Sequence, residues 1–150
     1  MQEYLDFALE IAEYAKKEML NHFDSNVAVD FKKDKTVVTE VDKNINHYLI
    51  QRVHEKYPEH SVIGEEESDK KKSRFLWVCD PVDGTGMYTD GLPVSVFSLA
   101  YVVDGEVQVG VVLDPYLDKV YTAIRGEGAF CNGERIHVRS EERRVGKESR

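Results

Sequence analysis

Residues 76–88 read Leu-Trp-Val-Cys-Asp-Pro-Val-Asp-Gly-Thr-Gly-Met-Tyr, and this stretch decides both the fold and the chemistry that the sequence predicts. The apolar run from Phe75 to Cys79 is short and rich in β-forming residues, which predicts a buried strand. The strand delivers Asp80 and Asp83 to a Gly-Thr turn. Carboxylates at a strand end, followed by free backbone N–H groups, can hold a hard cation and a phosphate side by side. The stretch therefore predicts metal-assisted phosphate chemistry.

Composition limits the class of protein. The chain has 150 residues, 41% of them hydrophobic, and a formal net charge of −8. This length fits one domain or part of a larger one. The acidic balance argues against nucleic acid and anionic membranes as partners, because binding them relies on basic patches. Without an apolar leader, a membrane-length apolar run or a CxxC motif, we expect a cytoplasmic protein whose two cysteines, Cys79 and Cys131, are free and packed.

The last twelve residues differ in character from the rest. Residues 139–150 are mostly charged and show no apolar periodicity. Arg139 to Glu148 resembles the in-frame translation of a common sequencing adapter, and the alternative is a solvated charged tail. We therefore expect a native portion over residues 1–138 that continues in the natural protein, and a non-native tail over residues 139–150.

Hydrophobic periodicity predicts an α+β fold. Apolar residues three or four apart predict an amphipathic helix over 3–23 and a second helix from Thr39 to Pro58. A short hairpin is expected over 24–38, a short strand over 61–63 and a charged loop over 68–74. The strands expected after residue 74 span 75–79, 94–103, 106–113, 119–124 and 128–131. Two helices followed by successive hairpins predict a helix pair packed on an antiparallel sheet.

Asp80 and Asp83 are the first candidate metal ligands. The intervening Pro81-Val82 should bend the chain so that both acids aim at one point, and the Val82 carbonyl could join them as an oxygen ligand. Magnesium and calcium favour such oxygen ligands. The alternative is an ordinary Asp-rich turn.

Two further acidic sites are candidates. Glu65, Glu66 and Glu67 follow the strand ending at Ile63 and form either a solvated loop or a metal ligand. Asp42 lies in Thr-x-x-Asp before an apolar-periodic run, which is a capping box, and it could both cap the helix and function.

The Gly-Thr turn itself is a candidate anion site. Thr85 could orient a water beside a carboxylate, or it could simply cap a helix. Gly84 and Gly86 let the backbone approach an anion closely, and the N–H groups of a following helix start would bind phosphate.

Three motifs together resemble a known family. Residues 38–42 (Val-Thr-Glu-Val-Asp), 64–66 (Gly-Glu-Glu) and 80–85 (Asp-Pro-Val-Asp-Gly-Thr) resemble, in this order, the inositol monophosphatase family of magnesium-dependent, lithium-sensitive phosphatases. Residues 126–133 resemble its next landmark. The resemblance covers residues 1–138 and implies the layered sugar-phosphatase fold, truncated before its C-terminal α/β half.

The resemblance implies a ligand set for magnesium. Glu65, Asp80 and the Val82 carbonyl would hold a first ion, Asp80 and Asp83 would share a second, and Glu65 would touch a loosely held third.

The resemblance also implies the remaining roles and the reaction. Asp42 and Thr85 would activate the attacking water, and the Gly84 and Thr85 N–H groups would bind phosphate. The expected reaction is direct in-line hydrolysis of a small phosphomonoester, without a covalent phospho-enzyme, by a protein that is a homodimer at full length.

The sequence departs from the family pattern in two places. Met87 stands where an Asn is expected. The family's late Trp-Asp motif, which carries another metal ligand and substrate contacts, is absent because the chain ends before it could occur. The fragment itself is therefore expected to be inactive or only partly folded.

Two rival interpretations and several substrates remain open. Asp80-x-x-Asp83-Gly84-Thr85 also resembles the Asp-x-Asp-Gly-Thr motif of haloacid-dehalogenase-type phosphatases, with one extra residue. A non-catalytic binder of magnesium and phosphate is the other possibility. Family substrates include inositol phosphates, fructose 1,6-bisphosphate, adenosine 3′,5′-bisphosphate and histidinol phosphate. The short loop between Glu67 and Phe75 favours an inositol monophosphatase or a dual inositol and fructose-bisphosphate phosphatase.

Overall fold

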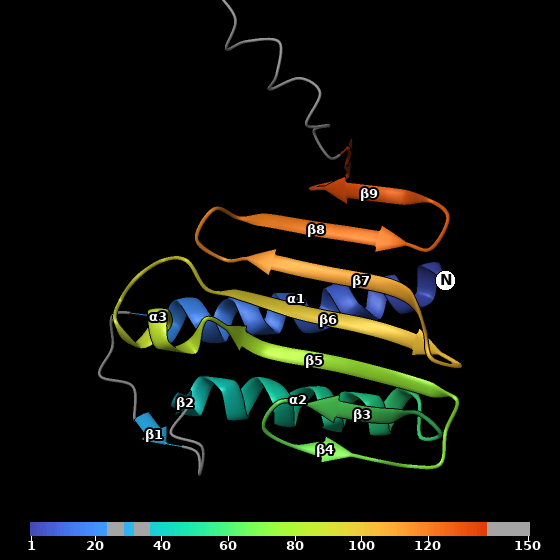
Figure 1. Cartoon of the computed structure of the whole chain (residues 1–150), viewed down its shortest axis with the longest axis horizontal. Coiled ribbons are helices and arrows are strands. Elements are labelled where there is room, and N and C mark those ends of the chain that lie inside the picture. The colour runs from blue at the N-terminus through green and yellow to red at the C-terminus, as the bar shows by residue number, and fades with distance from the viewer. Residues whose placement is uncertain (24–28, 32–36, 138–150) are drawn as a thin grey trace, which may run out of the picture.

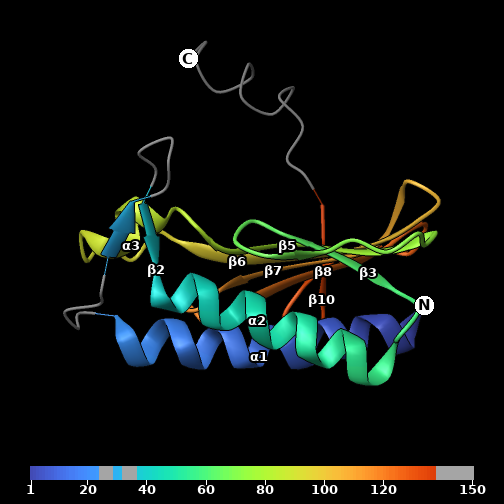
Figure 2. The same ribbon diagram turned by 90° about the horizontal axis from the view of Figure 1, so that it is seen from below.

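Two long helices lie side by side on one face of a large sheet, as Figures 1 and 2 show. This computed structural model describes residues 1–23, 29–31 and 37–137. Helix α1 spans Gln2–His22 and helix α2 spans Glu40–Lys56, close to the two helices that periodicity predicts. Each turns one apolar stripe toward the sheet, and the buried residues of these stripes form one core with it. The expected α+β class, with a helix pair packed on a sheet, is confirmed.

The described strands form a small and a large sheet. Strands β1 (Val29–Phe31) and β2 (Val37–Thr39) pair antiparallel, and the rest of the hairpin expected over 24–38 lies outside the described residues. The large sheet has the order β10-β9-β8-β7-β6-β5-β3-β4. Its strands are β3 Ser61–Gly64, β4 Ser68–Asp69, β5 Phe75–Asp83, β6 Val96–Val103, β7 Glu106–Asp114, β8 Lys119–Ile124, β9 Gly128–Cys131 and β10 Glu134–Ile136.

The large sheet is mixed rather than wholly antiparallel, which corrects the expectation from the hairpins. Strand β3 pairs parallel with β5, with Gly64 opposite Cys79, whereas the other paired neighbours in the described sheet are antiparallel. The chain turns back through the edge strand β4, so β5 starts at the same end as β3. The C-terminal ends of these two strands therefore lie at the same end of the sheet.

Several elements differ from the prediction in length. Strand β5 continues four residues past Cys79 to Asp83, and the short helix α3 (Thr85–Thr89) follows it directly. The two-residue strand β4 lies in the segment expected as a charged loop, and β10 was not predicted. Elements this short leave no measurable periodicity in a sequence.

An aromatic cluster fills the core beneath the helices. Tyr4 stacks on Tyr101 with ring centroids 4.2 Å apart, and Trp77 is fully buried beside Tyr101. The Trp77 indole N–H donates to Nδ1 of His60 at 3.1 Å, and His60 is only 6% exposed. Cys79 is buried and Cys131 half-buried, and both are free, as expected. Among the described residues no helix is both long and apolar enough to cross a bilayer.

Replacing His60 with Asn should make the protein less sensitive to acid. Burial lowers the pKa of His60 below its ordinary value, so the unfolded chain binds a proton more readily than the folded one. The stability that the neutral ring contributes is present above the ordinary histidine pKa of about 6.5 and is lost as the pH falls below it. An Asn oxygen can accept the Trp77 bond without titrating.

Urea unfolding of both proteins at about pH 7.5 and about pH 5.5 checks this, since the two conditions bracket the ordinary pKa. His60→Asn should lose less stability between them than the unmodified chain. Equal losses would show that His60 is not the acid-sensitive group.

Candidate active site

Asp42 caps the helix on which it lies. Thr39 precedes α2, and its backbone N–H donates to Asp42 Oδ2 at 2.8 Å while the Asp42 N–H donates to Thr39 Oγ1 at 3.3 Å. The Thr39 hydroxyl also donates to Asp42 Oδ2. This is the capping box that the sequence predicts. Both side chains are fully buried, so the cap fixes the Asp42 carboxylate in one orientation.

The same carboxylate reaches the turn after β5. The Thr85 hydroxyl lies 3.1 Å from Asp42 Oδ1 and 2.8 Å from the Val82 carbonyl oxygen. A hydroxyl has one proton, so it can donate fully to only one of these acceptors and its lone pairs remain open to a water. Asp42 therefore both caps α2 and contacts Thr85, and its catalytic role stays a prediction.

Burial makes Asp42 harder to ionise. Desolvation raises the pKa of its carboxyl above the ordinary value, while the hydrogen bonds from Thr39, Thr85 and its own backbone oppose that rise. A carboxylate with a raised pKa is a stronger base, which suits a group that accepts a proton from water.

A bulge in β5 bends the chain between the two aspartates. Asp80 pairs with Ser98 and Asp83 pairs with Val96, so β5 carries one extra residue between these pairs. Residues three apart in a regular strand point to opposite faces, and an extra residue re-aims the later side chain. This is the bend expected from Pro81-Val82, and both of these residues are buried.

The bulge leads into a glycine turn. Gly84 has φ 92°, a left-handed conformation that other residues rarely adopt, and it is the N-cap of α3. Thr85 is thus the first helical residue and not the cap itself. The first N–H groups of a helix have no partner within it, so the backbone at Gly84 and Thr85 can donate to an anion.

Glu65 meets Asp80 at the end of the parallel pair. Each residue directly follows a partner of the Gly64–Cys79 pair, so Glu65 and Asp80 lie at the same end of this parallel pair. The pKa of Asp80 is raised to about 7, first by burial and then by the charge of Glu65, a hydrogen bond to Glu65 and the charges of Asp83 and Asp42. Near neutral pH, Asp80 therefore holds a proton toward Glu65 for part of the time.

The acids at this edge fit a hard cation. Asp80 Oδ1 is buried and has no hydrogen-bond partner among the residues that the structure describes. A buried acceptor without a partner, crowded by like charges, is what a cation would satisfy. Yet no three His, Cys, Asp or Glu side chains of the described chain are already arranged to hold a metal ion, and Asp83 and Glu65 are exposed. The hydrogen bond between Asp80 and Glu65 relieves part of the repulsion at this site, and a cation would take the place of the shared proton.

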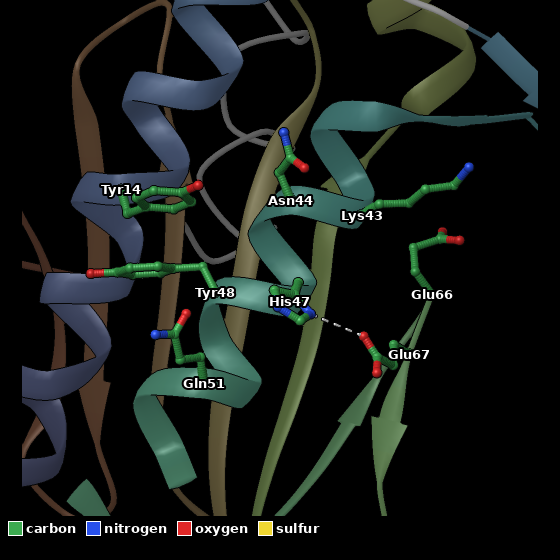
Figure 3. A pocket seen from close by; sticks show the side chains of 8 residues that line it. All are labelled: Tyr14, Lys43, Asn44, His47, Tyr48, Gln51, Glu66 and Glu67. Carbon is green, nitrogen blue, oxygen red and sulfur yellow. Dashed lines mark ion pairs between the residues drawn. The ribbon is translucent and has the colours of Figure 1, made fainter. Parts of the chain in front are cut away.

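Sequence reasoning missed one buried polar residue near these acids. Asn46 lies one helical turn after Asp42, is fully buried, and bonds the backbone of Glu66 and Glu67. Its signal was a polar residue on the apolar face of α2, between Ile45 and Leu49. A pocket of about 600 Å³ lies on the outer side of α2. Figure 3 shows its lining side chains, among which His47 faces Glu67 of the same loop.

The comparison with protein families agrees with this geometry. The model of the inositol monophosphatase family matches residues 1–149, so the chain belongs to that family. The resemblance noted in the sequence is confirmed. The haloacid-dehalogenase alternative is thereby set aside, because the aspartates lie in the motif of a different family.

Three curated relatives are similar along most of the chain. Inositol monophosphatase 1 of Bos taurus is 33% identical, covering 94% of this chain and 53% of its own length. The histidinol-phosphatase of Chlorobaculum parvum is 38% identical (89% and 52%). The fructose-1,6-bisphosphatase/inositol-1-monophosphatase of Thermotoga maritima is 37% identical (89% and 52%). The chain thus spans about half the length of the curated relatives it matches.

Two solved structures have the same fold over that half. The IMPase of Thermotoga maritima superposes with a TM-score of 0.86 at 35% identity, covering 93% of this chain and 55% of that one. An IMPase/NADP phosphatase crystallised with Mg²⁺ and phosphate superposes with a TM-score of 0.80 at 29% identity, covering 91% and 53%.

Asp80→Asn should stabilise the metal-free protein above neutral pH. The folded pKa of about 7 lies above the ordinary value, so the stability that the protonated group contributes is full below about pH 4 and is lost as the pH rises through 7. An amide cannot ionise and escapes this loss. Because Asp80 is partly exposed, solvent screening limits the effect to about 1–2 kcal/mol at about pH 8.

Chemical unfolding in the presence of a chelator checks this prediction. The difference between Asp80→Asn and the unmodified chain should grow from about pH 5 to about pH 8. A constant difference over this range would mean that Asp80 is not crowded by the other acids.

Proposed function

We propose that the whole protein is a magnesium-dependent phosphomonoesterase that hydrolyses a small phosphorylated polyol or sugar by direct attack of water. The observation that carries this proposal is the convergence of Asp80, Glu65 and the Asp42–Thr85 pair at the ends of β3 and β5. Family membership supports the reaction class, because the relatives described above are named as phosphatases.

The acidic residues of the site would have two different roles, metal binding and proton transfer. Asp80, whose buried Oδ1 has no hydrogen-bond partner within the described part of the chain, would hold magnesium. The neighbouring Glu65 and Asp83 and the Val82 carbonyl would join it as ligands. The Val82 oxygen accepts from Thr85 and keeps a second lone pair for a cation. Magnesium, when bound, supplies positive charge that activates water and relieves charge on the leaving oxygen.

Asp42 and Thr85 would handle the proton of the attacking water. When Thr85 donates to Asp42 Oδ1, the hydroxyl oxygen can accept a hydrogen bond from a water and fix the orientation of that water. As the water gives a proton to the Thr85 oxygen, Thr85 would pass its own proton to Asp42, whose raised pKa favours accepting it. The backbone N–H groups of Gly84 and Thr85 would hold the phosphate, where the left-handed turn at Gly84 opens the chain toward an anion.

The substrate proposal is inositol monophosphate, with fructose 1,6-bisphosphate as a second substrate. The names of the bovine and Thermotoga relatives support these two, and the Chlorobaculum relative makes histidinol phosphate the compound to compare with them. Inhibition by lithium, a homodimer at full length and a cytoplasmic location remain predictions, as does the non-native origin of residues 139–150.

Asp83→Asn should lower magnesium-dependent phosphate release by several orders of magnitude. The amide keeps the shape of the side chain but removes a negative charge from the proposed metal site. The measurement is phosphate release from inositol monophosphate by the full-length protein that carries this chain. Asp90→Asn, an exposed residue just after α3, is the matched control and should keep the unmodified rate.

Unchanged turnover in Asp83→Asn would refute its assignment as a ligand. A folded full-length protein that binds magnesium and phosphate but releases no phosphate from any of the three substrates would instead favour the non-catalytic binder.

A further inference from the structure

Asn46 connects α2 to the loop that carries Glu65. The side chain is 0% exposed. Its Nδ2 donates to the Glu67 carbonyl at 2.9 Å, and its Oδ1 accepts from the N–H groups of Glu66 and Glu67 at 3.3 and 3.4 Å. One amide therefore satisfies three backbone groups of a loop 20 residues away in sequence.

The loop is a tight hairpin with Glu65 at its tip. Strands β3 and β4 pair up to Ile63 and Ser68, and the Gly64 N–H donates to the Glu67 carbonyl at 3.1 Å. Glu65 and Glu66 are the two residues between that pair. Fixing the backbone of Glu66 and Glu67 therefore fixes the direction in which Glu65 leaves the hairpin.

Close packing of Asn46 explains why the loop starts with glycine. A Cβ atom on Gly64 would lie 1.9 Å from Asn46 Oδ1 and 2.5 Å from the Glu67 carbonyl oxygen, closer than non-bonded atoms allow. The hairpin thus lies so close to the Asn46 amide that even a methyl side chain at residue 64 would not fit. Such contact indicates a fixed loop position rather than a chance neighbour.

We propose that Asn46 is a positioning residue that holds Glu65 beside Asp80. Asn46 acts through the backbone of Glu66 and Glu67. This role rests on the proposed function, in which Glu65 and Asp80 hold magnesium. Asp42 and Asn46 lie four residues apart on one buried face of α2, so a single rigid helix sets the positions of both Asp42 and Glu65. Groups that orient metal ligands in this way strongly affect metal affinity.

An asparagine suits this position because the loop presents both donors and an acceptor. An aspartate would accept from the two N–H groups but could not donate to the Glu67 carbonyl, and it would add a negative charge beside three glutamates. A leucine of similar size would fill the space and leave the N–H groups of Glu66 and Glu67 without this acceptor.

His47 provides a matched control on the same helix and loop. Its ring lies 3.6 Å from the Glu67 carboxylate, and Figure 3 shows the pair on the outer side of α2. The side chains are 72% and 59% exposed, and exposed ion pairs contribute little. Removing this contact should therefore leave the loop where it is.

The test compares Asn46→Leu with His47→Gln in the full-length protein. The first readout is hydrogen exchange at the Glu66 and Glu67 amides without metal, which should become about tenfold faster in Asn46→Leu. The second is the magnesium dissociation constant from calorimetry, which should rise about tenfold or more. His47→Gln should match the unmodified protein in both.

The outcomes separate this proposal from the proposed function. Unchanged exchange and magnesium affinity in Asn46→Leu would overturn the role of Asn46. An unmodified protein that does not bind magnesium would refute the proposed function, while the exchange data would still test the loop contact. If Asn46→Leu does not fold, Asn46→Asp provides the test. Its side-chain oxygen still accepts from the Glu66 and Glu67 amides, which should stay protected from hydrogen exchange. Fast exchange at these amides in Asn46→Asp would contradict the proposal.

Discussion

The crowding of the carboxylates of Glu65, Asp80 and Asp83 at the C-terminal ends of β3 and β5 is the constraint on which the site depends. The parallel pairing of β3 with β5 places Glu65 and Asp80 side by side, and the charge of Asp83, which follows the bulge in β5, acts on Asp80 as well. Burial then deprives Asp80 of solvent, so its pKa rises to about 7. Such an arrangement costs stability unless a proton or a cation neutralises it. Without a bound cation, the crowded carboxylates therefore lower the stability of the folded protein.

Helix α2 joins the stability of the fold to the geometry of the site. Asp42 satisfies the N-terminus of α2 through the capping box, and the same carboxylate accepts from Thr85 after β5. Asn46, one turn later, bonds the loop that carries Glu65. The helix also supplies apolar residues to the core, so packing fixes it against the sheet. Two segments distant in sequence, the turn at Thr85 and the loop that carries Glu65, are thereby held in fixed positions by one helix.

The sequence allowed prediction of what depends on local pattern. The periodicity of α1 and α2, the hairpin from β6 to β7 and the capping box at Asp42 all follow from residue spacing. The parallel pair of β3 and β5 could not be foreseen, because the strand that reverses the chain between them, β4, has only two residues and no pattern of its own. Asn46 was missed for a related reason: a polar residue on an apolar helix face acquires meaning only when its distant partner is known.

Magnesium binding, measured by calorimetry near pH 7 in two buffers of different ionisation enthalpy, tests the central claim most directly. A cation that binds Asp80 must displace the proton that the carboxyl holds toward Glu65. The account predicts saturable binding with release of protons near pH 7, and this release should decrease toward higher pH. Binding without proton release, or no binding at all, would contradict the claim that these crowded carboxylates form a metal site.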